Sequence, residues 1–148
     1  MRFHLVDRIH SVERWHGIEA VKHTSSSETY WSTDDLGPYM PMAIQLEVLA
    51  QSAAWLVYLS TERTRRAVLL SVGSVITRAK VRPGDEIHAT AEIRSTGDTI
   101  VVSGRLRVAD RVVLDVEDLM CALIDADILE DADSVRGREE LLRSGERA

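Results

Sequence analysis

Glu47 and Gln51 are the polar side chains whose types and spacing most clearly suggest chemistry in this chain. They lie four residues apart within a long apolar run, 40–59, so a helix would place both on one face, one turn from each other. A carboxylate in such surroundings is costly to bury unless another group pairs with it. A carboxylate in an apolar cleft is typical of acid/base catalysis. Glu47 is therefore the first candidate catalytic residue; the alternative is a glutamate at the rim of the apolar region, or one held by backbone N–H groups.

The run 40–59 predicts one long helix with almost no solvent face. Pro41 suits its first turn, where a missing N–H costs nothing. A helix that is hydrophobic all round must be surrounded by protein or by lipid. The run is slightly shorter than the roughly 20 residues of a membrane span, and Glu47 and two amides interrupt it. We therefore expect protein to surround this helix, and we expect no membrane association.

A long polar segment, 24–39, precedes the helix. It contains three consecutive serines, the pair Asp34-Asp35 and the turn dipeptide Gly37-Pro38. A loop of this length inside a compact domain is uncommon and is often functional. The segment therefore predicts a functional loop directly before the helix.

The bulk properties limit the class of protein. A chain of 148 residues is the size of one domain, and its net charge of −6 argues against a nucleic-acid partner. The first residues lack the uninterrupted apolar core of a signal peptide. A single cysteine, Cys121, excludes an intrachain disulfide, which fits a reducing cytoplasm. Cys121 lies in an apolar run, so we interpret it as a packing residue.

The rest of the chain is dominated by alternating, β-branched segments. A short lead-in at 3–13, which we expect to be helical, comes first, and strands are predicted at 15–23, 67–81, 86–95, 99–108 and 112–124. One helix against a curved antiparallel meander can be buried on all sides within so few residues. We predict an α+β hotdog fold over 1–126, with a charged tail at 127–148 that is partly helical or mobile. A lone copy would leave the sheet edge and the cleft half-built, so we expect a dimer.

Several of these stretches resemble the 3-hydroxyacyl-acyl-carrier-protein dehydratases of the FabZ type. The resemblance rests on 3–9, on Lys22 with Glu28, on Met40-Pro41, on 46–51, on 82–85 and on 119–122. It extends from residue 3 to about 124 in the family's order and spacing, and the helix motif is its most specific part.

The resemblance implies a mechanism. In that family a loop histidine removes the C2 proton of a 3-hydroxyacyl thioester, and a helix carboxylate from the partner subunit handles the departing hydroxyl. A backbone N–H at the helix N-terminus holds the thioester carbonyl. The carboxylate corresponds to Glu47, and the N–H falls on Met42, where the family prefers glycine. The substrate would travel on the phosphopantetheine arm of acyl carrier protein, and no cofactor or metal of the chain's own is implied.

The loop histidine of the family has no counterpart here. Counting back from Glu47 puts Thr33 in its place, and counting forward from Glu28 puts Asp34 there. The segment 24–39 contains no histidine, and we expect the five histidines elsewhere to be surface or satisfied residues. This departure puts dehydration by the chain alone in question.

Three functions stay open from the sequence. The first is dehydration in fatty-acid or polyketide biosynthesis, either in a heterodimer with a related histidine-bearing subunit or in a homodimer with Asp34 as the base. The second is thioester hydrolysis on the same fold, with Asp34, Asp35 or Glu47 activating water. The third is a non-catalytic scaffold or acyl-binding subunit, in which Glu47 is structural.

Residues that bind the substrate and its carrier can be suggested separately. Gln51 shares the face of Glu47, and Trp31, beside the loop, either lines an acyl tunnel or belongs to the core. The cations Arg78, Lys80 and Arg82 alternate along a predicted strand and would share one face. Such a patch suits an acidic carrier protein or a phosphopantetheine phosphate; a solvated strand face explains it equally well.

Overall fold

The computed structural model describes residues 4–129 and 131–144. The first residue of the expected lead-in at 3–13, and positions 130 and 145–148 of the expected tail, lie outside the described residues. The elements, in chain order, are β1 (Arg8–Glu13), β2 (Gly17–His23), β3 (Ser32–Asp34), β4 (Gly37–Tyr39), α1 (Met42–Ser60), β5 (Arg65–Thr77), β6 (Glu86–Ser95), β7 (Thr99–Val108), β8 (Arg111–Asp125), α2 (Ala126–Leu129) and α3 (Ala132–Arg143).

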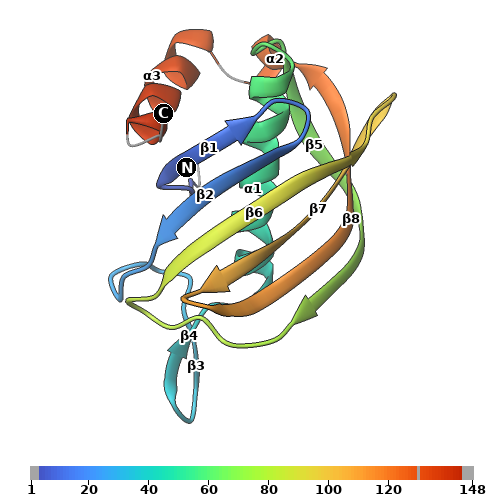
Figure 1. The fold of residues 1–148 in the computed structure, drawn as a ribbon. Coiled ribbons are helices and arrows are strands. Elements are labelled where there is room, and N and C mark those ends of the chain that lie inside the picture. The colour runs from blue at the N-terminus through green and yellow to red at the C-terminus, as the bar shows by residue number, and fades with distance from the viewer. Residues whose placement is uncertain (1–3, 130, 145–148) are drawn as a thin grey trace.

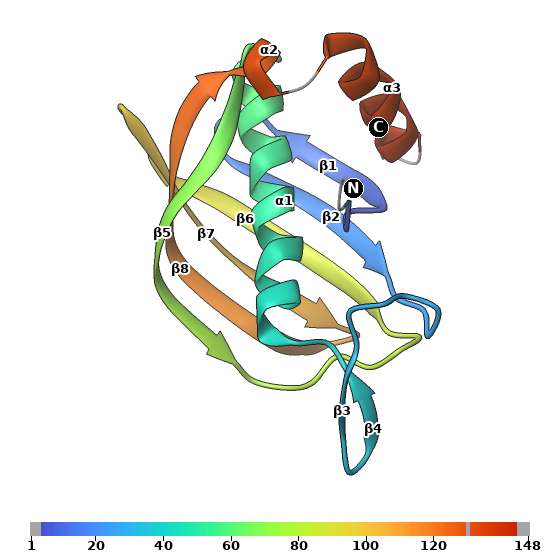
Figure 2. The ribbon, with the colours of Figure 1, turned by 180° about the vertical axis from the view of Figure 1, so that it is seen from behind.

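A six-stranded antiparallel sheet curves around α1 (Figures 1 and 2). Its strand order is β1-β2-β6-β7-β8-β5, and β3 pairs with β4 in a separate small hairpin. The side chains alternate along the strands, so that those of one face pack on the helix. The prediction of an α+β hotdog fold, with one long helix wrapped by a curved antiparallel sheet, is confirmed.

Two predictions about the strands are wrong. The lead-in at 3–13 is not helical: Arg8–Glu13 forms β1, which pairs with β2, because an extended chain can complete the sheet edge there. The expected meander is also rearranged, since β5 pairs with the far side of β8 while β6 pairs with β2. This order closes the sheet around the helix and leaves β5 at its edge.

The core lies between α1 and the concave face of the sheet. The C-terminal half of α1 is almost wholly buried. Gly104 of β7 permits the close approach, since a Cβ there would lie 2.9 Å from Cδ1 of Leu49 and 2.3 Å from the carbonyl oxygen of Thr90. Among the described helices α1 alone is long and apolar enough to span a membrane by length and composition, but 56% of its apolar window is buried inside the protein. That burial is typical of the core helix of a folded domain.

The C-terminal helix α3 packs beside β1 (Figure 1). Asp131 caps it by accepting a hydrogen bond from the backbone N–H of Ser134, at 3.1 Å. Val135 and Leu142 bury one face of the helix. On the same face Glu139 accepts two hydrogen bonds from Arg63, at 2.6 and 2.7 Å. An apolar face and a bidentate ion pair therefore fix this part of the charged tail on the domain.

Candidate active site

Glu47 lies on the one side of α1 that the chain leaves partly open. Ala43, Glu47, Ala50 and Ala54 are exposed or partly exposed there, and their spacing makes them a stripe along one helical face. The expectation that the helix is enclosed on every side therefore holds only for its C-terminal half within a single copy. Glu47 is half-buried, so its carboxylate can be reached from outside the chain.

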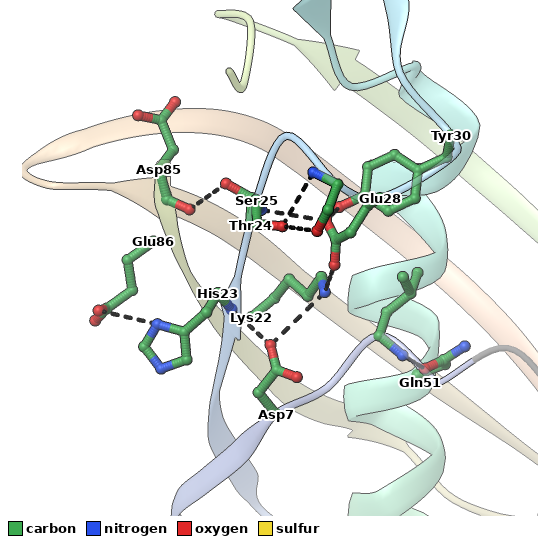
Figure 3. A network of polar contacts seen from close by, with 12 residues as sticks. Asp7, Lys22, His23, Thr24, Ser25, Glu28, Tyr30, Gln51, Asp85 and Glu86 are labelled. Carbon is green, nitrogen blue, oxygen red and sulfur yellow. Dashed lines mark hydrogen bonds and ion pairs between the residues drawn. The ribbon is translucent and has the colours of Figure 1, made fainter. Parts of the chain in front are cut away.

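A chain of two hydrogen bonds holds the carboxylate of Glu47 in place. Its Oε1 accepts from Nε2 of Gln51, at 3.0 Å. Oε1 of Gln51 in turn accepts from the backbone N–H of Leu5, at 2.7 Å. Because each amide atom of Gln51 has its own partner, the orientation of that amide is fixed. Gln51 is thus a positioning neighbour of Glu47 in this structure, and Figure 3 shows it on α1 beside the polar network of the loop.

The N-terminus of α1 carries no capping side chain. Pro41 occupies the cap position without a side-chain hydrogen bond, and there is no acidic residue in the first turn. The first backbone N–H groups with a partner in the helix are those of Ile44 and Gln45, which both donate to the carbonyl of Pro41. Met42, the first helical residue, is 48% exposed. The N–H groups at this positive helix end are therefore placed to meet an oxygen from outside the helix.

A groove with a volume of about 520 Å³ opens beside this helix end. Residues 39–42 and Gln45 line it on one side, and residues 77–80 line it on the other. Most of its lining from the helix side is apolar, while Arg78 and Lys80 belong to the other wall. A narrow apolar arm with an anionic end would fit these walls.

The positions that replace the loop histidine, Thr33 and Asp34, lie on the β3–β4 hairpin, which projects from the body of the domain (Figures 1 and 2). Thr33 is exposed. Asp34 accepts from both terminal nitrogens of Arg82, at 2.9 and 3.1 Å, and also from Lys80. Hydrogen bonds from Arg82 and then from Lys80 hold the pKa of Asp34 far below its ordinary value. A carboxylate so stabilised as an anion is a weak base.

The cations proposed for carrier binding mostly secure the hairpin. β5 ends at Thr77, so Arg78, Lys80 and Arg82 follow the strand, and the prediction that they alternate along it is wrong. Arg82 also donates to the carbonyls of residues 37 and 38, and Nζ of Lys80 lies 4.2 Å from the ring centre of Tyr39. Arg78 pairs with an acid of β8. Arg78 and Lys80 nevertheless keep 52% and 51% of their side chains exposed.

A second network holds the start of the loop (Figure 3). Lys22 is only 4% exposed, bonds to Glu28 and lies 3.7 Å from Asp7. Burial opposes ionisation of Glu28, but hydrogen bonds from Lys22 and Tyr30, together with the charge of Lys22, lower the pKa of its carboxyl. Burial and the hydrogen bond to Glu28 raise the pKa of the Tyr30 phenol. Trp31, expected in the core or an acyl tunnel, packs against the core and donates to a loop carbonyl, at 2.9 Å.

The other titratable candidates named here have contacts of their own. His23 and His88 both contact Glu86, at 3.3 and 2.8 Å, and the ring of His10 lies 6.1 Å from that of His88. Cys121 is buried, and burial raises the pKa of its thiol to about 11, as suits a packing residue. Within the described part of the chain, no cluster of three histidine, cysteine or acidic side chains could hold a metal ion.

The fold places the chain among the hotdog proteins. It superposes on an uncharacterised protein of Pyrococcus horikoshii with a TM-score of 0.66 and 20% identity, covering 85% of this chain and 88% of that one. A Streptococcus mutans protein bound to acetyl-CoA superposes with a TM-score of 0.63 and 16% identity. The match covers 84% of this chain and 91% of that one. A thioesterase of Pseudomonas aeruginosa gives 0.63 and 17%, covering 81% of each. At these identities the likeness shows the fold.

Relatives in sequence show to which family of hotdog proteins the chain belongs. No family model matches the chain. The 3-hydroxyacyl-(acyl-carrier-protein) dehydratase FabZ of Bacillus subtilis is 31% identical over 118 residues, which cover 78% of this chain and 84% of that protein. FabZ of an Acidovorax species is 32% identical over 127 residues, which cover 82% of this chain and 87% of that protein. FabZ of Ralstonia nicotianae is 30% identical over 125 residues, which cover 80% of this chain and 76% of that protein. The chain belongs to the FabZ-type 3-hydroxyacyl-acyl-carrier-protein dehydratase family, as its sequence motifs predict.

Proposed function

We propose that this chain contributes Glu47 to the dehydration of 3-hydroxyacyl thioesters carried by acyl carrier protein. The observation that carries the proposal is the fixed, reachable carboxylate in α1, held by Gln51 beside an uncapped helix N-terminus. Removal of the hydroxyl as water needs a proton donor, and the departing proton at C2 needs a base. The C2–H and C3–O bonds break, a C2–C3 double bond forms, and water leaves.

Each part of the site has a role in that reaction. Glu47 in its protonated form gives its proton to the leaving hydroxyl. The N–H of Met42 at the positive helix end stabilises the oxygen of the thioester as charge develops on it. The exposed side chain of Met42 borders the groove, so the thioester must pass it.

The base is proposed to come from another subunit. The loop has no histidine, and Asp34 is tied to Arg82 and Lys80 and is therefore a poor base. A related, histidine-bearing hotdog chain would supply the missing group across a dimer interface. The β5 edge supports a dimer, since within the described chain no strand lies on its outer side and Val68, Leu69, Leu70 and Ile76 are exposed there.

Carrier recognition follows from the groove. Arg78 and Lys80 stand half-exposed at its wall, where they can meet the phosphate of the arm or the acidic surface of a carrier protein. A role in cytoplasmic fatty-acid or polyketide synthesis is consistent with a free cysteine and with the family's substrates.

Intact-mass spectrometry of a 3-hydroxyacyl acyl carrier protein tests the proposal. The carrier is incubated with the purified chain alone and then with the chain plus its histidine-bearing relative. Loss of one water in the mixture, and little with the chain alone, is expected. Rapid water loss with the chain alone would contradict a shared site, because it would require a base within this chain. No water loss under either condition would contradict the dehydratase proposal.

Thioester hydrolysis is the second candidate, favoured by the likeness of the fold to a thioesterase of Pseudomonas aeruginosa. Glu47 would then activate a water molecule at the thioester carbonyl. The same mass measurement separates the two reactions, because hydrolysis returns the unloaded carrier. An unchanged carrier would leave a non-catalytic, acyl-binding subunit.

A further inference from the structure

Gln45 is a buried polar side chain for which the dehydration chemistry gives no role. It lies in the first turns of α1, is only 2% exposed and lines the groove at the helix N-terminus. Its Nε2 donates a long hydrogen bond to the backbone carbonyl of Met40, at 3.5 Å. Its Oε1 has no hydrogen-bond partner among the described residues. A buried acceptor without a partner loses its hydration and gains nothing in return, so its retention calls for an explanation.

The orientation of this amide follows from its surroundings. If the two terminal atoms exchanged places, Oε1 would face the carbonyl oxygen of Met40, and two acceptors would oppose each other. The arrangement with Nε2 toward Met40 is therefore favoured, and it is Oε1 that lacks a protein donor. Gln45 borders the groove, and its Oε1 is buried beneath the groove wall, so a donor in the groove meets this acceptor after a small shift of the side chains that cover it.

We propose that Gln45 Oε1 accepts a hydrogen bond from the substrate, from an N–H or O–H group that enters the groove at the N-terminus of α1. This inference rests on the proposed function and makes Gln45 a specificity-determining residue of the same site. With the phosphate near Arg78 and Lys80, the arm runs along the groove toward Gln45. Two groups on such a substrate carry the required donor: the amides of the pantetheine arm and the hydroxyl at C3 of the acyl group. A hydrocarbon chain offers no donor.

Two soluble probes distinguish these sources. Butyryl pantetheine has the amides only, and 3-hydroxybutyryl pantetheine has the amides and the hydroxyl. Binding of each to the full chain is measured by ligand-observed NMR titration, with the wild-type protein and with Gln45→Met, which keeps the length of the side chain and removes the acceptor. Ser52→Ala is the matched control, because Ser52 is equally buried in α1 but already donates to the carbonyl of Val48, at 2.9 Å.

We expect Gln45→Met to weaken binding by about tenfold, the effect of one hydrogen bond to a buried acceptor. If an amide is the donor, the variant loses affinity for both probes equally. If the hydroxyl is the donor, it loses affinity only for 3-hydroxybutyryl pantetheine. Ser52→Ala leaves both affinities unchanged. The melting temperature of unliganded Gln45→Met should change little, since the variant removes the unpaired Oε1 but also removes the donor to the carbonyl of Met40.

Three results would overturn the inference. Unchanged binding of both probes by Gln45→Met would show that the substrate gives Oε1 no donor. A much lower melting temperature, or failure of Gln45→Met to fold, would show that the amide is held by more protein contacts than its one long hydrogen bond to Met40. If the wild-type protein itself bound neither probe, the proposed function would fall and this inference with it.

Discussion

Glu47 combines a fixed position with access from outside, which an acid/base carboxylate needs. Gln51 holds one carboxylate oxygen, and Leu5 holds Gln51 through its backbone N–H. A purely structural carboxylate in a core would be enclosed and paired with cations. Glu47 is half-buried, and the side chain that holds its carboxylate is a neutral amide. The carboxylate is therefore held in place yet open to a substrate.

Exchange of Glu47 for glutamine separates chemistry from packing. The new amide can still accept the hydrogen bond from Gln51, so the melting temperature should change by less than about 2 °C. Dehydration in the presence of the histidine-bearing partner should fall by at least about 100-fold, the usual contribution of a general acid. The rate is followed by carrier mass, and the melting temperature by calorimetry.

The contrasting variant is Gln51→Met. It leaves the N–H of Leu5 without its acceptor, so it should lower the free energy of unfolding by about 1 kcal/mol or more. It should also lower kcat while leaving KM nearly unchanged, because it misplaces Glu47 without removing it.

If Glu47→Gln retained full activity, the carboxylate would have no acid/base role.

At the scale of elements, the β3–β4 hairpin depends on one anchor. Arg82 binds Asp34 through two nitrogens and also binds the backbone of residues 37 and 38. The hairpin otherwise projects away from the sheet (Figure 1), so little packing supports it. The anchor therefore sets the position of the loop beside the groove.

We expect Arg82→Met to loosen this hairpin selectively. Amide hydrogen exchange across 33–39 should quicken about tenfold or more, while exchange in α1 stays slow, because only local contacts are lost. Arg94→Met is the control, since Arg94 pairs with Glu92 on the exposed sheet surface at 3.5 Å. Equal exchange rates at 33–39 in both variants would show that the anchor does not order the hairpin.

The attachment of α3 should depend on pH. Hydrogen bonds from Arg63, together with its charge, lower the pKa of Glu139 although burial opposes this. A carboxyl whose pKa is lower in the folded state stabilises that state above its unfolded pKa of about 4.3, and the contribution is lost as the pH falls from there through the folded pKa. The helix should therefore hold firmly at pH 6 and weaken below about pH 4.

The variant Glu139→Gln isolates this contribution from the other carboxyls. Hydrogen exchange at Val135 and Leu142 is measured at pH 6 and pH 3.5 in both proteins. The wild type should lose protection between the two values, and the variant should be less protected at pH 6 and change less. A variant whose pH dependence matched that of the wild type would exclude Glu139 as the titrating group.

At the scale of the whole molecule, the proposed dimer would cover the open stripe of α1 or the β5 edge. Leu70→Lys adds a charge to the exposed edge and should shift sedimentation toward the monomer, because a charged edge strand resists pairing with another strand. Leu141→Lys is the matched control on α3, where the leucine is 72% exposed. The same dissociation in both variants would exclude β5 as the interface.

The sequence predicted the helix, the later strands and the place of Glu47 within that helix because each has a local signal. A long apolar run gives the helix, and alternation gives β6, β7 and β8. Strand order has no such signal, so the placement of β5 beside β8 was missed. The lead-in was misjudged because β1 is a short edge strand without clear alternation.

The site was predictable only in part, because contacts between distant segments have no local signal in the sequence. Asp34 and Arg82 are 48 residues apart, and nothing local indicates that they form an ion pair. Asp34 was therefore a candidate base from the sequence. The hydrogen bond between Glu47 and Gln51 follows from helical spacing, whereas the link to Leu5 depends on how the N-terminal segment crosses α1.

Complementation between two chains is the sharpest test of whether Glu47 serves a site shared between subunits. The histidine-bearing relative is prepared with its own helix carboxylate changed to glutamine, then mixed with this chain, and water loss from a 3-hydroxyacyl carrier protein is measured. We predict that neither chain alone is active, that the mixture is active, and that Glu47→Gln abolishes the activity of the mixture. A mixture that works equally well with Glu47→Gln, or a wild-type mixture that stays inactive, would contradict the claim that this chain supplies the catalytic carboxylate.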